Sequence, residues 1–149
     1  MALYTNQFGQ LVGFPMAFPG PWASPEGITL RGRTCTLHRT GPEHAQGLFD
    51  SFGQDRSRQN WTYMPTNRTL DFTEFEAWFL ETCLGEDILF YTIFDLRGVP
   101  IGLASYLRIT PDLGSIEVGW ISMSPLMQRT TMSTEAMYLM MAHVFDDLG

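Results

Sequence analysis

The residues best suited to chemistry form a short polar loop between an apolar run and a helical pattern near the end of the sequence. The loop consists of Gln128, Arg129, Thr130, Thr131, Met132 and Ser133. It follows a strand expected at 115–123 and opens a helix expected at about 132–148. A helix start has unpaired N–H groups and a partial positive charge, so this loop could hold a phosphate without lysine. A capped helix that binds no ligand would show the same residues.

Several kinds of catalysis are excluded by residue types alone. The chain has nine Arg and no Lys, so a lysine nucleophile, a Schiff base and a phosphate-loop lysine are impossible. The three histidines, His38, His44 and His143, are scattered, so the sequence predicts no metal site. Cys35 and Cys83 form no CxxC pair, which is typical of reduced thiols in a cytoplasmic protein.

The charge balance narrows the class of partner. The 149 residues carry a net charge of −7, which opposes binding to phosphate backbones, so no nucleic-acid partner is expected. An acidic surface favours a cationic partner such as an amine or a basic peptide. No apolar run of about twenty residues is present, so no membrane span is expected either.

The chemistry-bearing loop must be positioned by a mixed set of elements. A strand is expected over 28–39, then a helix that opens with the capping box Thr40–Glu43. A polar loop at 51–70 leads to a second helix, which opens with the capping box Thr73–Glu76. Three later runs, 88–94, 99–109 and 115–123, are separated by turns and predict an antiparallel meander.

The helical stripes identify the expected core. The first helix presents Ala45, Leu48, Phe49 and Phe52; the second presents Phe75, Trp78, Phe79 and Cys83; the last presents Met132, Ala136, Leu139, Met140 and Phe145. Residues 1–27 form a separate unit, an extended arm rich in proline and aromatic residues. Phe8, Leu11, Phe14, Phe18 and Trp22 could attach this arm to residues 28–149 or to a partner.

The order of three segments resembles the GNAT superfamily of acetyl-CoA-dependent N-acetyltransferases. These segments are Ile116–Ile121, Ser124–Thr130 and Thr134–Met140, preceded by a matching block at 90–107. The resemblance covers about 29–149 and is closest to the Rim-type branch, which acetylates ribosomal-protein N-termini. It implies an α/β (α+β) fold, with a mainly antiparallel sheet flanked by helices. The family continues with further strands after the last helix, and these strands are missing from the sequence.

The resemblance also implies roles for individual residues. Ile121, Ser122 and Met123 would pair with the pantetheine arm of acetyl-CoA, and residues 128–133 would hold its pyrophosphate. Glu117 would be the general base, acting directly or through water; a solvated face residue is the alternative. The family loop usually has small residues where this chain has Arg129 and Thr131, so close backbone wrapping of the phosphate depends on other features.

Three functions remain open at this point. The chain could transfer an acetyl group from acetyl-CoA to a primary amine of a protein N-terminus or a small molecule. It could instead be an inactive remnant or an interaction module of the same fold. Another chain, such as a second copy, could also complete the sheet at its exposed edge.

Overall fold

A five-stranded antiparallel sheet forms the centre of the protein. The computed structural model describes residues 4–13, 20–55, 59–62, 64 and 71–149. The sheet order is β3-β4-β5-β6-β7, which is also the order along the chain. The strands are β3 (Leu30–Arg31), β4 (Cys35–Arg39), β5 (Leu89–Asp95), β6 (Pro100–Thr110) and β7 (Ser115–Met123).

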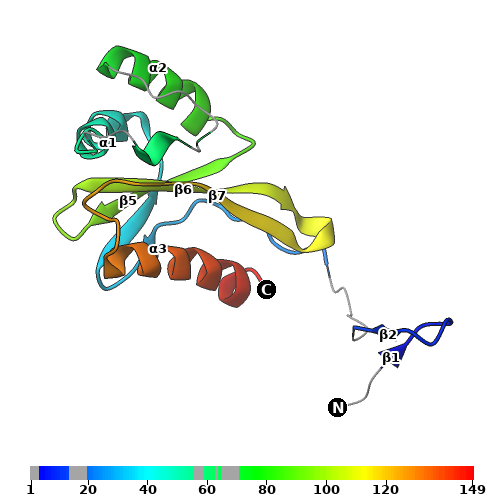
Figure 1. Ribbon diagram of the computed structural model, residues 1–149. Coiled ribbons are helices and arrows are strands. Elements are labelled where there is room, and N and C mark those ends of the chain that lie inside the picture. Colours follow the sequence, from blue (N-terminus) through cyan, green and yellow to red (C-terminus); the bar gives the residue numbers. More distant parts are fainter. Residues whose placement is uncertain (1–3, 14–19, 56–58, 63, 65–70) are drawn as a thin grey trace.

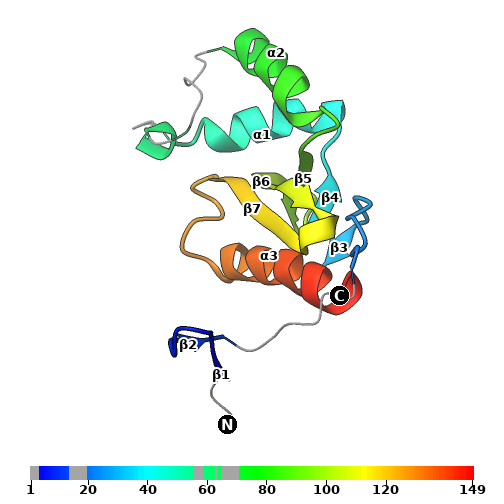
Figure 2. The ribbon, with the colours of Figure 1, turned by 90° about the vertical axis from the view of Figure 1, so that its right-hand side faces the viewer.

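Helices cover both faces of the sheet (Figures 1 and 2). α1 (Ala45–Phe52) and α2 (Phe72–Cys83) lie on one face, and α3 (Thr131–Ala142) lies on the other. The described residues also contain short helical turns: η1 (Pro42–His44), η2 (Gln59–Trp61), η3 (Pro111–Leu113) and the π-helical η4 (His143–Asp147). The expected sheet flanked by helices is therefore confirmed.

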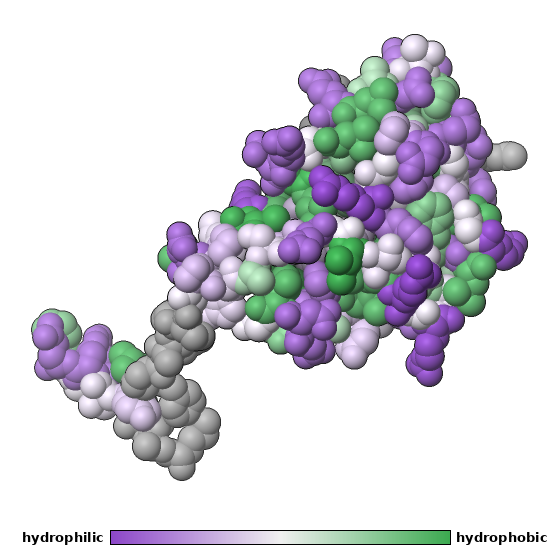
Figure 3. All heavy atoms as spheres, turned by 180° about the vertical axis from the view of Figure 1, so that it is seen from behind, coloured by the Kyte–Doolittle hydropathy of each residue, from purple (hydrophilic) through white to green (hydrophobic). Residues whose placement is uncertain are grey.

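Each face of the sheet has its own apolar core. Leu37, Tyr106 and Met140 belong to the core beneath α3. Leu48 and Phe79 belong to the core beneath α1 and α2. Successive residues of a strand point to opposite faces, and β5 and residues 101–106 of β6 are buried on both sides, which accounts for their nearly continuous apolar runs. On the face of the body shown in Figure 3, apolar and polar side chains are interspersed.

The predicted meander is confirmed almost residue by residue, because local turns define it. Gly98 takes φ +80° in the turn between β5 and β6, and Gly114 takes φ +58° after η3. Both positions lie in the left-handed region that glycine adopts without steric cost. β7 spans Ser115–Met123, as predicted.

The single strand predicted over 28–39 is wrong. The structure has a tight hairpin, in which Leu30 pairs with Leu37 and Arg31 with Thr36. The Gly32 amide donates to the Cys35 carbonyl at 2.9 Å and closes the turn. The turn residues Arg33 and Thr34 find their hydrogen-bond partner on α3, which is about 100 residues away in the sequence.

Both predicted capping boxes are displaced. The hydroxyl of Thr40 meets the hydroxyl of Thr92 at 3.0 Å inside the sheet, so it does not cap α1. His44 Nδ1 accepts from the Gly41 amide instead. α2 begins earlier than predicted, because Asp71 Oδ1 accepts from the Glu74 amide at 2.9 Å.

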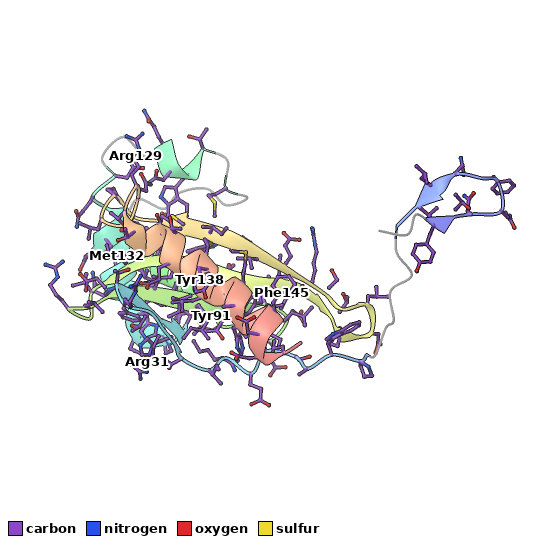
Figure 4. The ribbon with its side chains drawn as sticks, turned by 90° about the horizontal axis from the view of Figure 1, so that it is seen from below. Arg31, Tyr91, Arg129, Met132, Tyr138 and Phe145 are labelled. Atoms are coloured by element: carbon purple, nitrogen blue, oxygen red, sulfur yellow. The ribbon has the colours of Figure 1, made fainter. Side chains whose placement is uncertain are left out.

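The last helix ends earlier than predicted. α3 stops at Ala142, and the wider turn of η4 changes the side-chain phase. Ala136 and Met140 are buried as expected, but Phe145 is 75% exposed, so its assignment to the buried face is wrong. Figure 4 shows Arg129 and Met132 at one end of α3 and Phe145 at the other. No helix in the described residues is long and apolar enough to cross a membrane.

The arm contains a small hairpin, β1 (Tyr4–Thr5) paired with β2 (Leu11–Val12). Phe8 and Leu11 remain exposed, at 76% and 68%, so neither attaches the arm to the body. Trp22 does: its amide donates to the Pro111 carbonyl at 3.2 Å, and its indole N–H donates to the Gly149 carbonyl at 2.7 Å. Phe14 and Phe18 lie outside the described residues. The division at residue 27 stays a prediction.

Candidate acyl-transfer site

A β-bulge in β7 marks the start of the site. Ser105 of β6 pairs with Gly119 and Leu103 pairs with Ser122, so Trp120 and Ile121 together oppose Ala104 alone. Trp120 takes φ +50°, a strained value for a bulky aromatic residue. Its ring packs 5.9 Å from the ring of Phe90 in the core beneath α1 and α2. The bulge therefore changes the direction of the backbone just before Ser122.

β7 is also an edge strand. Among the described residues it pairs only with β6. Alternate N–H and C=O groups of an edge strand point outward, so this edge can accept an extended ligand or another strand. Ile121, Ser122 and Met123 occupy the end of this edge, where the sequence predicts the pantetheine arm.

A pocket of about 210 Å³ joins the end of β7 to the segment that connects α1 and α2. Its lining residues are Phe52, Asn60, Trp61, Ile121, Ser122, Met123 and Gln128. Gln128 Nε2 donates to Asn60 Oδ1 at 2.8 Å and to the Met123 carbonyl at 2.9 Å. The side chain of Gln128 therefore ties the expected cofactor strand to η2.

The loop before α3 achieves a tight bend without glycine. The Ser124 carbonyl accepts from the amides of Met127 and Gln128, at 2.9 Å and 3.1 Å. Arg129 then takes φ +59°, in the left-handed region. Glycine would adopt this conformation without strain, so the loop has the backbone shape of a glycine loop with a charged side chain at the bend.

The N-terminus of α3 is not capped by its own side chain. Thr130 is the N-cap residue, but its hydroxyl donates to the Met127 carbonyl at 2.7 Å. The Ser133 hydroxyl donates back to the Thr130 carbonyl. In α2, by contrast, Asp71 accepts from a first-turn amide. Among the described residues, no side chain accepts from the first-turn N–H groups of α3, from Thr131 to Ser133, so these groups suit an anion.

Glu117 lies apart from this cluster. Ile116 and Val118 pack toward the core beneath α3, so Glu117 faces the side of α1 and α2. It precedes Ile121 by four residues, about 13 Å of strand at 3.3 Å per residue. Its Oε2 accepts from Arg108 Nη1 at 2.7 Å.

The structure thus brings together most of the residues predicted from the sequence. Ile121, Ser122, Met123 and Gln128 line one pocket, and residues 129–133 follow directly into α3. Sequence reasoning missed Asn60 and Trp61, because nothing in a polar loop indicates which strand it will meet. In the described residues, no three His, Cys, Asp or Glu side chains are grouped as a metal site would require.

Comparison with known proteins identifies the fold. The model of the family described as acetyltransferase (GNAT) domain matches residues 35–149. A GCN5-related N-acetyltransferase from Brucella melitensis is 32% identical with a TM-score of 0.82, and the match covers 87% of this chain and 59% of that chain. A Chromobacterium violaceum protein assigned to the GNAT family is 27% identical with a TM-score of 0.78, over 93% and 70% of the two chains.

A more distant similarity concerns the fold alone. A Vibrio cholerae protein assigned as a ribosomal-protein-serine acetyltransferase is 15% identical with a TM-score of 0.66, over 85% of this chain and 71% of that chain. No curated protein matches the sequence.

The antiparallel sheet, with α1 and α2 on one face and α3 on the other, defines a mixed α/β fold that is shared with known acetyltransferases. The chain belongs to the GNAT acetyltransferase family. Members of this family use acetyl-CoA as a cosubstrate. The chain spans 59% of the length of the Brucella protein.

Proposed function

We propose that this chain binds acetyl-CoA and transfers the acetyl group to a primary amine by direct attack. One observation carries the proposal: the uncapped first turn of α3 follows directly from a pocket lined by Ser122, Met123 and Gln128. Acetyl-CoA is a long, flexible thioester that carries phosphate groups. It needs a pocket for its thioester end and, next to that pocket, an anion site for its phosphates. Acetyl-CoA supplies the activated carbonyl, and the protein supplies binding, orientation and proton transfer.

Each part of the site has a definite task in this proposal. The N–H groups of Thr131–Ser133 bind the pyrophosphate, and Arg129 adds a charge-assisted contact. The outward backbone groups of Ile121–Met123 hold the pantetheine arm. The bulge at Trp120 turns nearby amides toward the thioester carbonyl, where negative charge develops. Glu117 accepts the amine proton through water, since it lies well before the pocket along β7.

The acceptor class follows from charge and from the pocket wall. The net charge of −7 favours a cationic acceptor. Phe52 and Trp61 line the pocket and pack edge to face, with ring centroids 5.6 Å apart, and aromatic side chains attract ammonium groups. A protein N-terminus, as in the Rim-type branch, and a small amine both meet these conditions. Free, buried Cys35 and Cys83 agree with a cytoplasmic location for this reaction.

Two measurements test the proposal. Isothermal titration with coenzyme A should show saturable binding, and a thiol-release assay with acetyl-CoA should detect transfer to at least one amine in a panel of peptides and polyamines. Absence of coenzyme A binding at high protein concentration would overturn the proposal. Binding without transfer would leave the interaction module as the better description.

The outer edge of β7, which pairs with no strand in the described part of the chain, supports a second candidate, in which another chain adds a strand there. A second copy of this chain is one source of that strand. Light scattering over a range of concentrations tests this idea, because an active protein that stays monomeric would exclude it.

A further inference from the structure

One carboxylate connects α3 to the turn between β3 and β4. Glu135 Oε1 accepts from the Arg33 amide at 2.8 Å, and Oε2 accepts from the Thr34 amide at 2.7 Å and the Cys35 amide at 3.2 Å. The Thr34 hydroxyl donates to the same Oε2. Three consecutive backbone donors and one hydroxyl thus converge on a single side chain, as in an anion-binding nest.

The turn is shaped to receive this carboxylate. A Cβ on Gly32 would lie 2.6 Å from Glu135 Cδ, so a larger residue there would require the carboxylate to shift from its place in the turn. The Cys35 thiol lies 3.7 Å from Oε2. The hydrogen bond from the Thr34 side chain, followed by those from the turn amides, lowers the pKa of Glu135 from 4.5 to about 2. The carboxylate therefore stays ionised over the whole physiological range.

This contact lies one turn inside a helix that has no side-chain cap. A cap would hold the helix start in place but would occupy an N–H group that a ligand needs. A lateral anchor at Glu135 holds the same end of α3 and leaves the first-turn N–H groups of Thr131–Ser133 available. Figure 4 shows Met132 in this turn and Arg31 on the neighbouring hairpin.

We propose that Glu135 is the positioning residue for the phosphate-binding end of α3, acting through the β3–β4 turn. The inference rests on the proposed function, since it names the residue that controls binding of the phosphate-bearing part of acetyl-CoA. Glu135 itself contacts no reacting atom. Its loss should affect affinity for the phosphates and leave the acetyl-transfer step unchanged at saturation.

The test compares Glu135→Gln with Asp71→Asn, which removes the corresponding charge from the capped helix α2. Coenzyme A affinity should fall about tenfold in E135Q, or ~1.4 kcal/mol, and should be unchanged in D71N. Binding of pantetheine, which lacks the pyrophosphate, and kcat at saturating acetyl-CoA should be unchanged in both variants. Thr34→Val removes one hydrogen bond to Glu135 and is a milder change. It should lower coenzyme A affinity in the same direction, and it keeps the test possible if E135Q does not fold.

Hydrogen exchange in the ligand-free protein provides a readout independent of coenzyme A. Amides 134–137 should exchange faster in E135Q than in the wild type, and D71N should leave them unchanged. If the wild type binds coenzyme A, the positioning role is overturned when E135Q has the same coenzyme A affinity as the wild type. It is also overturned when amides 134–137 of E135Q exchange at the wild-type rate. Failure of the wild type to bind coenzyme A would instead refute the proposed function. The exchange measurement alone would then test whether Glu135 holds the N-terminal end of α3.

Discussion

Arg108 Nη1 and Glu117 Oε2 are joined by a 2.7 Å hydrogen bond at the surface of the β6–β7 hairpin. The Arg108 side chain is 79% exposed and that of Glu117 is 45% exposed, so the pair contributes little to stability. Its importance is chemical. The bond fixes Oε2 of the candidate base, and among the described residues no hydrogen bond occupies Oε1, which can therefore bind water.

Glu117→Gln should reduce acetyl transfer by about 10²-fold or more and leave coenzyme A affinity unchanged, because general base catalysis typically contributes 10²–10⁴-fold. Steady-state rates and titration calorimetry measure the two quantities separately. Glu81→Gln, the same change on the exposed face of α2, is the control and should keep full activity. A Glu117→Gln variant with wild-type rates would assign Glu117 to the solvated surface.

Arg129→Gly should leave the free energy of unfolding nearly unchanged and weaken coenzyme A binding. Relief of the left-handed strain at φ +59° contributes about 1 kcal/mol, and the greater entropy of glycine in the unfolded chain offsets most of it. Loss of the guanidinium removes a phosphate contact. Chemical denaturation and calorimetry measure the two effects, and Arg129→Lys should recover part of the affinity. Full affinity in Arg129→Gly would show that the side chain does not reach the ligand.

Stability should decrease on acidification through Glu135. Its pKa is about 2 in the folded protein and its ordinary value is 4.5, so the folded state favours the ionised form. The resulting stabilisation is complete above 4.5 and is lost as pH falls from 4.5 toward 2. Urea unfolding of the wild type and of Glu135→Gln at several pH values measures this difference. The two curves should converge at low pH; parallel curves would contradict the assignment.

Gly114→Ala should destabilise the protein more than Gly98→Ala. Both glycines have positive φ, at +58° and +80°, so alanine costs about 1 kcal/mol of backbone strain at either position. A Cβ at Gly114 would also lie 2.7 Å from the Trp22 ring, whereas a Cβ at Gly98 meets no atom within 4 Å. The difference in melting temperature therefore measures the packing of Trp22. Equal losses would mean that Trp22 moves away at little cost.

Much of the fold could be predicted because its signals are local. β7 was predicted at its observed bounds, and β5 and β6 within one residue, because apolar runs end at turns that need glycine. The apolar stripe of α2, with Phe75, Phe79 and Cys83 buried, follows from helical spacing alone. The order of strand, loop and helix at 115–142 also indicated the GNAT family, because these three elements follow one another directly in the sequence.

Tertiary contacts decided which partners several polar side chains bind, because the neighbouring sequence is compatible with more than one partner for each. Thr40 is a good cap by type, yet its hydroxyl pairs with Thr92 in the sheet. Nothing beside Asn60 in the sequence indicates that its amide will meet Gln128. Glu135 also looks like an ordinary helix residue, and only the fold brings the turn at 33–35 against it. The sequence determined where β5, β6 and β7 lie and that a polar loop leads into the last helix. The packing of α3 on the β3–β4 hairpin decided how the N-terminal end of α3 is held, because these contacts join residues about 100 positions apart.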